Sequence, residues 1–194
     1  HAGTTPLHLR ADALMAAAHF VIQAPRLVQQ QFPNAVVTCG DLTVHPGVHN
    51  VVPSNVALLL EFRASGAETL THMERMLLDL AQECTAVSDH LAFTVAPLDQ
   101  YEPISMNPSI QTAIVRACDA LGYRTMTFSS GALHDAGILA RTVPAGMVFV
   151  PSINGRSHCP QEDTASADLV AGANVLLHTA LILAQEQNQE AGTQ

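Results

Sequence analysis

Alternating apolar and polar residues in the first third of the chain predict two β-strands, over residues 35–45 and 56–63. The second strand would place four apolar side chains on one face: Val56, Leu58, Leu60 and Phe62. The turn sequence H-P-G-V-H-N joins the two strands, so we expect them to pair as an antiparallel hairpin. Gly40, inside the first strand, predicts a β-bulge or the close approach of another segment.

Apolar residues spaced three or four apart predict a helix on each side of this hairpin. The first helix is expected over residues 9–23, bent or ended by Pro25, with this apolar face: Leu14, Ala17, Ala18 and Val21. The second is expected over residues 68–87 with this stripe: Leu70, Met73, Leu77, Leu80, Cys84 and Val87. The stripe favours packing on a sheet over a coiled coil, because it covers fewer than three heptads. With a third strand over residues 91–98, the pattern predicts a two-layer α+β domain.

Three prolines between residues 97 and 108 predict a domain boundary. We therefore expect an α+β domain over residues 1–103 and a second domain over residues 104–194. The second domain differs in its order of elements, which is typical of α/β proteins rather than α+β proteins.

The second domain is predicted to alternate helices with short apolar strands. Asn107 and Pro108 are a typical helix start, and strands are expected over residues 123–128 and 147–150. A long amphipathic helix is expected over residues 166–186. This order fits half of a doubly wound α/β layer.

Charge and composition exclude some partners. The 194 residues carry 8 Lys and Arg against 17 Asp and Glu, a net charge of −9, which argues against nucleic acid because phosphate binding needs clustered cations. No run of 18 apolar residues occurs, so no membrane partner is expected. The four cysteines form no C-x-x-C pair, which favours a reduced, cytoplasmic protein over a disulfide framework.

The loop P-S-I-N-G-R-S-H-C-P-Q-E-D-T, residues 151–164, has the richest chemistry in the chain. It follows an expected strand and precedes an expected helix, a position where α/β folds bind ligands. Within eight residues it holds these side chains: Arg156, His158, Cys159, Glu162 and Asp163. Spacing alone favours an ordinary loop histidine over a metal ligand at His158, so the rest of the chain has to decide.

Further candidates at loops and strand ends each have a structural and a functional interpretation. Arg63 is an exposed strand-end cation or a bidentate clamp on a substrate carboxylate. Asp135, after His134, is a helix-start carboxylate beside a surface histidine, or a carboxylate that orients a metal ligand. An Asx turn explains Asn50 well by itself.

Six motifs occur in order: H-A-G-T-T-P, R-A-D-A-L, P-G-V-H-N-V-V-P, E-F-R, S-G-A-L-H-D-A and G-M-V-F-V-P-S-I-N-G-R-S-H-C-P-Q-E. Together they resemble the carboxyl-terminal half of the hydantoinase/carbamoylase family of metal-dependent amidohydrolases. The resemblance implies a two-layer α+β lid and dimerisation domain over residues 1–103, without its first strand. It also implies that residues 104–194 are the carboxyl-terminal part of a dinuclear-metal, exopeptidase-like α/β catalytic domain.

The resemblance assigns a role to each candidate. His158 matches the last ligand of a two-metal site for zinc or manganese, with nickel or cobalt as substitutes. His1 matches a lid histidine that reaches into the partner subunit's active site and polarises the scissile carbonyl. Substrate contacts are implied for four residues: Asn50, Arg63, Gly131 and Ala132. Glu162 matches a carboxylate that supports the metal ligand, as Asp135 also would in its functional interpretation.

The implied reaction is hydrolysis of the C–N bond of an N-carbamoyl (ureido) amino acid, which releases ammonia and carbon dioxide. A water activated by two divalent metal ions would attack the ureido carbonyl, and His1 would help to stabilise the oxyanion. The implied partners are a small ureido or carboxylate substrate and a second copy of the chain, joined through the lid.

The resemblance also implies that part of the site lies outside this sequence. The family's other metal ligands and its glutamate base precede H-A-G-T, and neither an H-x-D pattern nor a Glu-Glu pair occurs here. We therefore expect a fragment that is inactive alone: a truncated form, a proteolytic product or one of two chains. Allantoate amidohydrolase activity and a non-catalytic dimerisation module are the alternatives, and the motifs fit a dipeptidase or aminoacylase less well.

Overall fold

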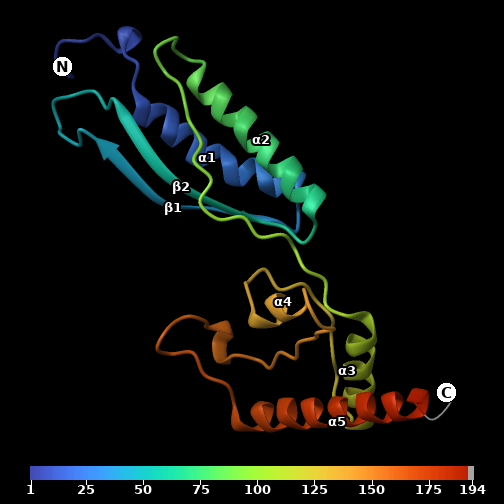
Figure 1. Cartoon of the computed structure of the whole chain (residues 1–194). Coiled ribbons are helices and arrows are strands. Elements are labelled where there is room, and N and C mark those ends of the chain that lie inside the picture. Colours follow the sequence, from blue (N-terminus) through green and yellow to red (C-terminus); the bar gives the residue numbers. More distant parts are fainter. Residues whose placement is uncertain (192–194) are drawn as a thin grey trace. The chain divides into compact units, whose positions relative to one another are not determined.

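The computed structural model describes residues 1–191 and side chains through residue 189, in two compact units, His1–Pro103 and Ile104–Gln194 (Figure 1). The elements of unit 1 are η1 (Leu7–Leu9), α1 (Ala13–Gln31), β1 (Val36–His45), β2 (Asn55–Arg63) and α2 (Ala67–Thr85). Those of unit 2 are α3 (Pro108–Ala120), α4 (Asp135–Leu139), η2 (Ile153–Gly155) and α5 (Ser166–Ala191). The fold is thus mixed, with helices and a two-stranded sheet, and the assignment of the units as lid and catalytic part stays a prediction.

The predicted antiparallel hairpin is confirmed. The β1–β2 register runs from the Val36–Arg63 pair to the His45–Asn55 pair, and it shifts at Gly40, where a bulge was expected. The half-buried positions of β2 include the four residues expected on its inner face: Val56, Leu58, Leu60 and Phe62. The alternation in the sequence therefore predicts both the pairing and the face that the strand buries.

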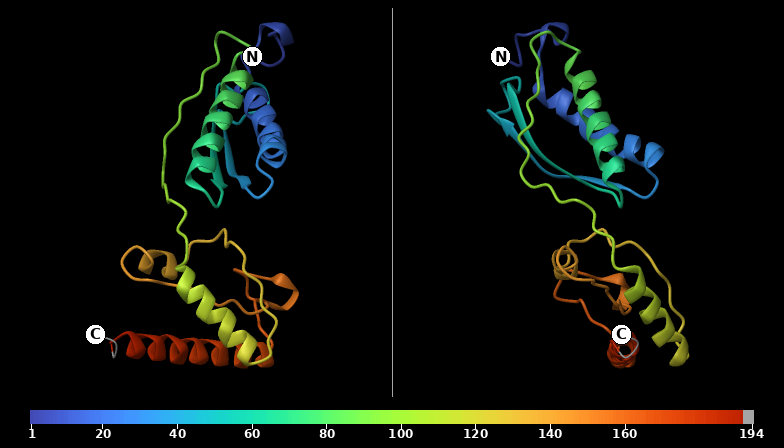
Figure 2. Two further views of the ribbon diagram at one scale, coloured as in Figure 1. Left: turned by 90° about the vertical axis from the view of Figure 1, so that its right-hand side faces the viewer. Right: turned by 45° about the vertical axis from the view of Figure 1, so that its right-hand side comes forward.

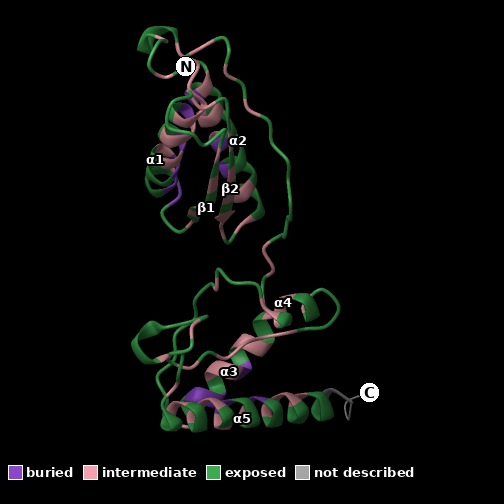
Figure 3. Ribbon diagram, turned by 90° about the vertical axis from the view of Figure 1, so that its left-hand side faces the viewer, coloured by how far each residue is buried: buried purple, intermediate pink, exposed green. Residues whose placement is uncertain are grey.

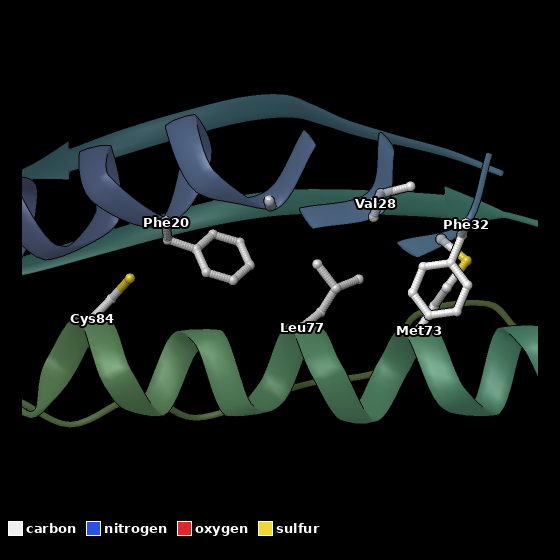
Figure 4. Packing of buried hydrophobic residues seen from close by; sticks show 7 residues of the cluster. Phe20, Val28, Phe32, Met73, Leu77 and Cys84 are labelled. Atoms are coloured by element: carbon white, nitrogen blue, oxygen red, sulfur yellow. The ribbon is translucent and has the colours of Figure 1, made fainter. Parts of the chain in front are cut away.

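Both helices of unit 1 cover the same face of the hairpin (Figure 2). The core between them consists of these buried residues: Phe20, Ala24, Val28, Phe32, Met73, Leu77 and Cys84 (Figure 4). The α2 stripe is largely as predicted, except that Val87 lies beyond the helix end and is 73% exposed. The two-layer arrangement of helices on a sheet follows from this packing.

Helix α1 differs from the prediction in its start, which is Ala13 rather than residue 9, in its end and in its buried face. It continues past Pro25 to Gln31, and its buried residues recur every four positions: Ala16, Phe20, Ala24 and Val28. A proline inside a helix costs on the order of 3 kcal/mol. Burying Val28 and Phe32 beyond the proline offsets this cost, since a fully buried side chain of this size contributes about 1.5–3 kcal/mol.

Three predicted strands are not formed. Residues 91–98, 123–128 and 147–150 have no hydrogen-bonded partner strand, and the hairpin is the only sheet within residues 1–191. A strand needs a neighbour to take up its backbone hydrogen bonds, and an apolar pattern in the sequence cannot supply that neighbour. Unit 2 is therefore helical and irregular in the part of the chain that the structure describes, rather than half of a doubly wound layer.

The core of unit 2 lies where α3 meets α5 (Figure 3). Its buried apolar cluster consists of Ala117, Cys118 and Val175. Helix α3 starts as predicted, since the Asn107 side chain accepts hydrogen bonds from the backbone N–H groups of Ser109 and Ile110. The four half-buried apolar residues packed against this core are Ile114, Leu121, Val148 and Ile182.

Two glycines let the segment at residues 145–150 pass close to both helices. A Cβ atom on Gly146 would lie 2.5 Å from Cγ2 of Ile110 in α3. A Cβ atom on Gly172 of α5 would lie 2.6 Å from Cγ1 of Val150. Carbon atoms pack at about 3.5–4.0 Å, so any larger residue at either position would force the Ile110 or Val150 side chain, or the segment that carries it, to shift.

Helix α5 is unusually apolar for a helix with little burial. Residues 166–189 have a mean hydropathy of 1.6 over the most apolar window, of which 11% is buried. The helix is long and apolar enough to cross a membrane. The sequence did not predict this property, because it contains no unbroken run of 18 apolar residues. Length and composition are the only support for this, and core helices of soluble proteins share both properties.

Candidate functional site

The structure brings two sequence-predicted residues, His1 and Asn50, to the same end of unit 1. The backbone N–H of Ala2 donates a hydrogen bond to the carbonyl oxygen of Asn50 at 2.9 Å. The H-A-G-T-T-P segment therefore lies against the turn that joins β1 to β2 (Figure 1). Both residues are exposed, so their side chains are accessible to a ligand.

The backbone around His1 folds into a tight turn. The N–H groups of Thr4 and Thr5 donate to the His1 carbonyl oxygen at 3.2 and 3.1 Å. The N–H of Gly3 donates to the Nδ1 atom of the His1 ring at 3.0 Å. Because Nδ1 accepts a hydrogen bond, the neutral ring carries its proton on Nε2, which is then available as a donor.

Arg63 lies at the opposite end of the hairpin from Asn50. Strand β2 runs from Asn55, next to the turn, to Arg63, and these eight steps at about 3.3 Å each span roughly 26 Å along the strand. The Arg63 guanidinium binds a carboxylate within its own chain, since Nε donates to Oε1 of Glu61 at 2.9 Å. One chain therefore does not bring Asn50 and Arg63 to one small substrate.

His158 has an uncommon backbone conformation that Glu162 supports. Its φ of 56° is in the left-handed region, which costs an L-residue about 1–2 kcal/mol. The backbone N–H of His158 donates to Oε2 of Glu162 at 2.7 Å, a charge-assisted hydrogen bond. The imidazole of His158 is exposed.

Two further contacts close the loop that carries His158. The N–H of Ile153 donates to the carbonyl oxygen of Asp163 at 2.8 Å, and Oγ of Ser152 donates to the carbonyl oxygen of Arg156 at 2.5 Å. These hydrogen bonds hold the two ends of the loop close together, and the segment that carries His158 lies between the bonded ends.

The loop that contains Gly131 and Ala132 leaves both residues exposed, and Asp135 is the exposed first residue of α4. Oγ of Ser130 lies 2.6 Å from Nε2 of His134, whose ring packs edge-on against Phe149 with 5.5 Å between ring centroids. Ser130 was not singled out from the sequence, because a serine four residues before a histidine is common.

Arg10 was also not singled out, although it belongs to the R-A-D-A-L motif. Its Nε and Nη2 atoms donate to the carbonyl oxygens of Thr5 and Ala2, at 2.9 and 2.5 Å. Nothing in the spacing of the sequence shows which carbonyl groups an arginine contacts, and this role depends on the folded turn.

The described residues supply no group of three or more His, Cys, Asp or Glu side chains that could hold a metal ion. Of the sequence-predicted residues, only His158 is an expected ligand. A zinc site uses three or four protein ligands, so one exposed imidazole does not fit a complete site. A complete zinc site would need ligands in addition to those that the described residues bring together.

Comparison with protein families identifies the relationship. The model of peptidase family M20/M25/M40 matches residues 5–182. The chain belongs to this family. Within the M20/M25/M40 family, the predicted resemblance to the hydantoinase/carbamoylase group is confirmed by the relatives that match the chain.

Two curated relatives are amidohydrolases by name. The chain is 39% identical over 180 residues to N-carbamoyl-L-amino-acid amidohydrolase of Paenarthrobacter aurescens, covering 91% of this chain and 43% of that protein. It is 34% identical over 181 residues to allantoate amidohydrolase of Escherichia coli, with coverage of 91% and 43%. The M20/M25/M40 chain described here thus spans less than half the length of these relatives.

Solved structures that match the chain support the same family relationship. A hydantoinase/carbamoylase family amidase from Burkholderia multivorans matches with a TM-score of 0.84 and 36% identity, over 92% of this chain and 43% of that chain. A dinuclear metal binding peptidase of the M20 family from Bacillus subtilis shares the fold, with a TM-score of 0.63 and 19% identity, over 89% of this chain and 46% of that one.

Proposed function

We propose that this chain is the carboxyl-terminal portion of a metal-dependent amidohydrolase that cleaves the C–N bond of N-carbamoyl amino acids and releases ammonia and carbon dioxide. The observation that carries the proposal is the hydrogen bond between Ala2 and Asn50, which places His1 beside Asn50. A hydrogen-bond donor and an amide side chain at one accessible end suit a ureido group. Relatives named N-carbamoyl-L-amino-acid amidohydrolase support this substrate class.

The separation of His1 and Arg63 supports a site shared between two chains. The roughly 26 Å length of β2 is far greater than an N-carbamoyl amino acid, so both ends of one hairpin cannot contact one substrate molecule. In a homodimer, one chain would provide His1 and Asn50 to a site, and the other chain would provide Arg63. Each hairpin would then contribute to two sites.

Each residue has a chemical role in this proposal. His1 would donate a hydrogen bond from Nε2 to the oxygen of the carbonyl group as it becomes negative. The planar guanidinium of Arg63 would bind the substrate carboxylate with two parallel hydrogen bonds. His158 would provide one imidazole to a divalent metal ion, with Glu162 holding its backbone and Asp135 in a supporting role. The exposed backbone of Gly131 and Ala132 would contact the substrate.

The remaining ligands and the general base would lie in an upstream half that is joined to this chain in the whole protein. A two-metal centre of zinc or manganese is proposed from the family and from the dinuclear metal binding peptidase with the same fold. The cytoplasm, where thiols stay reduced, is the proposed location because the four cysteines are free within the described structure.

Replacing Arg63 tests the carboxylate clamp. In the whole protein, Arg63→Lys should raise KM for an N-carbamoyl amino acid about tenfold or more, because one compact ammonium replaces a two-pronged donor. The loss should be smaller for an N-carbamoyl amine without a carboxylate. Arg75→Lys, at an exposed position of α2, is the matched control and should change neither value. Equal losses on both substrates would show that Arg63 does not bind the carboxylate.

Mixing two inactive variants tests the shared site. In the whole protein, His1→Ala should lower kcat by roughly 10²–10³ with normal metal content, whereas His158→Ala should lower metal content itself. Combining His1→Ala protein with a variant of the upstream base should restore activity in heterodimers, because one of the two shared sites is then intact. Confirmed subunit exchange without recovered activity would refute the dimeric site.

Two other functions compete with this proposal. Allantoate also contains ureido groups and a carboxylate, and a relative of that name is 34% identical to the chain. The other candidate is a non-catalytic dimerisation module. Turnover of N-carbamoyl amino acids and of allantoate by the whole protein, with divalent metal, distinguishes the proposed activity from allantoate hydrolysis. A dimer with no turnover of either substrate would support the module.

A further inference from the structure

Arg10 holds the turn that presents His1. Its guanidinium donates two hydrogen bonds to backbone carbonyl oxygens of this turn, from Nε to Thr5 and from Nη2 to Ala2. Arg10 is partly buried, so the hydrogen bonds that its charged guanidinium donates are stronger than they would be in full contact with water. The turn itself, residues 1–5, has no regular secondary structure and depends on such contacts.

The position of Arg10 is set by the rigid part of unit 1. Arg10 directly follows η1, and Asp12, two residues further on, caps α1 by accepting hydrogen bonds from two backbone N–H groups. The N–H of Ala13, the first residue of α1, donates to the carbonyl oxygen of Pro53 at 3.1 Å. The start of α1 is thus tied to the β1–β2 connection, and Arg10 extends this link to the turn of His1.

The same turn sets the orientation of the imidazole. The hydrogen bond from Gly3 to Nδ1 of His1 leaves Nε2 as the protonated nitrogen. A Cβ atom on Gly3 would lie 3.1 Å from Cε1 of the ring, so glycine permits this close approach. The carbonyl oxygens that Arg10 binds flank Gly3 on both sides, which links the guanidinium to the position and tautomer of the ring.

We propose that Arg10 is a positioning residue for His1: it holds the turn of residues 1–5 so that Nε2 of His1 is presented as a hydrogen-bond donor. The catalytic consequence rests on the function proposed above, whereas the structural consequence does not. The proposal therefore has one test that needs no activity and one that does.

Amide hydrogen exchange tests the structural part on this chain. Arg10→Met, which keeps much of the side-chain length but no donor, should lower the protection of the Ala2 and Thr5 amides about tenfold, as expected for the loss of two hydrogen bonds. Arg10→Lys can keep one of the two bonds and should give an intermediate value. Arg26→Met, at an exposed position of α1, is the matched control and should leave both amides unchanged. Unchanged protection in Arg10→Met would overturn the proposal whatever the enzyme does.

The tautomer provides a spectroscopic measurement. In the parent chain at a pH where the ring is neutral, the ¹⁵N resonances of His1, assigned by comparison with His1→Gln, should show a protonated Nε2. Arg10→Met should shift them towards the averaged pattern of a mobile imidazole, and Arg26→Met should not. A His1 ring that keeps its tautomer and line width in Arg10→Met would also contradict the proposal.

A double-mutant cycle in the whole protein tests the catalytic part. If Arg10 acts through His1, Arg10→Met should lower kcat about tenfold with little change in KM, and it should have no further effect in a His1→Ala background. Losses that multiply would show that Arg10 acts independently of His1, and the catalytic role would be wrong. Full activity of His1→Ala would refute the proposed role of His1 and with it the catalytic role of Arg10, while the exchange result would still decide whether Arg10 holds the turn.

Discussion

The two units of this chain differ in whether their apolar residues find partners. In unit 1 the hairpin supplies both strands of a sheet, and the α2 stripe is buried, with Met73 at 0% and Leu77 at 4% exposure. In unit 2 the two apolar segments expected as strands have no partner, and Leu176 and Leu177 of α5 are each 58% exposed. Both units form their predicted helices, because a helix makes its hydrogen bonds within itself.

The difference between the units shows that an antiparallel pair of strands can form within a short stretch of chain, whereas a parallel pair needs a much longer one. A hairpin needs only one short connection, whereas parallel strands pair across long crossovers. A chain that spans less than half of its relatives can therefore close an antiparallel unit by itself. For unit 2 we expect the upstream half proposed above to provide the missing strands and to cover the exposed side of α5.

The largest expected effect is the ordering of unit 2 by that upstream half. In the whole protein, amides of residues 123–128 and 147–150 should gain protection from hydrogen exchange on the order of 10²-fold or more relative to this chain, because ladder hydrogen bonds open only with part of the fold. Amides of β1 and β2 should change little, since their ladder is already formed. No gain in residues 123–128 would mean that this segment is a loop in both forms.

Truncating equivalent leucines should separate the two units. Leu77→Ala in the core of unit 1 should lower the free energy of unfolding by about 2–5 kcal/mol, through lost burial and a cavity. Leu177→Ala on the exposed side of α5 should change it by less than about 0.5 kcal/mol in this chain. Urea unfolding followed by far-ultraviolet circular dichroism measures both. A large loss for Leu177→Ala would show that α5 is already covered.

Close packing in unit 2 is expected at one glycine. Gly172→Ala should lower the free energy of unfolding by about 1–3 kcal/mol, because its Cβ would meet the stiff side chain of Val150 at 2.6 Å. Gly137→Ala in α4 is the matched control, since its Cβ would lie 3.9 Å from Ile104, an ordinary contact. Thermal melts of both variants give the comparison, and equal melting temperatures would show that the segment at Val150 moves freely.

The smallest expected effect is a pH dependence from the core of unit 1. Burial, and to a lesser extent the charge of Glu83, raises the pKa of the Cys84 thiol above its usual 9.0. The unfolded chain therefore loses this proton at a lower pH than the folded chain, so stability from the neutral thiol is intact below about pH 9 and falls above it. The fall should be smaller in Cys84→Ala.

All 8 basic residues other than histidine are arginines and stay charged in this range, and the other ionisable groups are the same in parent and Cys84→Ala, so their effects cancel in the comparison. Unfolding of parent and Cys84→Ala between pH 8 and 10, both followed by circular dichroism, isolates the thiol. Parallel stability curves for the two proteins would show that the thiol ionises as easily in the folded chain as in the unfolded chain.

Local rules in the sequence predicted much of this fold. The alternation in residues 56–63 gave the inner face of β2, Gly40 marked the bulge, and Asn107 marked the start of α3. Each of these depends on a residue and its near neighbours. The end of α1 was predicted wrongly at Pro25, because the packing of Val28 and Phe32 against α2 outweighs the local preference.

For the candidate site too, the sequence indicated which residues are candidates, but it did not indicate their contacts. Motifs in the sequence indicated His1, Asn50 and His158 as candidates, because the residue types and their order carry that information. Their contacts depend on the fold: Ala2 binds the carbonyl of Asn50, and Arg10 binds the turn of His1. Such contacts join residues that spacing alone cannot relate.

By itself, the sequence determined the presence of the main helices, the hairpin with its irregularity at Gly40, and the family, since these depend on periodicity, turn residues and motifs. Tertiary structure alone decided which expected strands form, that Arg63 lies a strand's length from Asn50, and that Arg10 holds the His1 turn. The physical reason is that a helix or a tight turn satisfies its hydrogen bonds locally. Strand pairing and a shared site need groups that are distant in the chain or belong to another part of the protein.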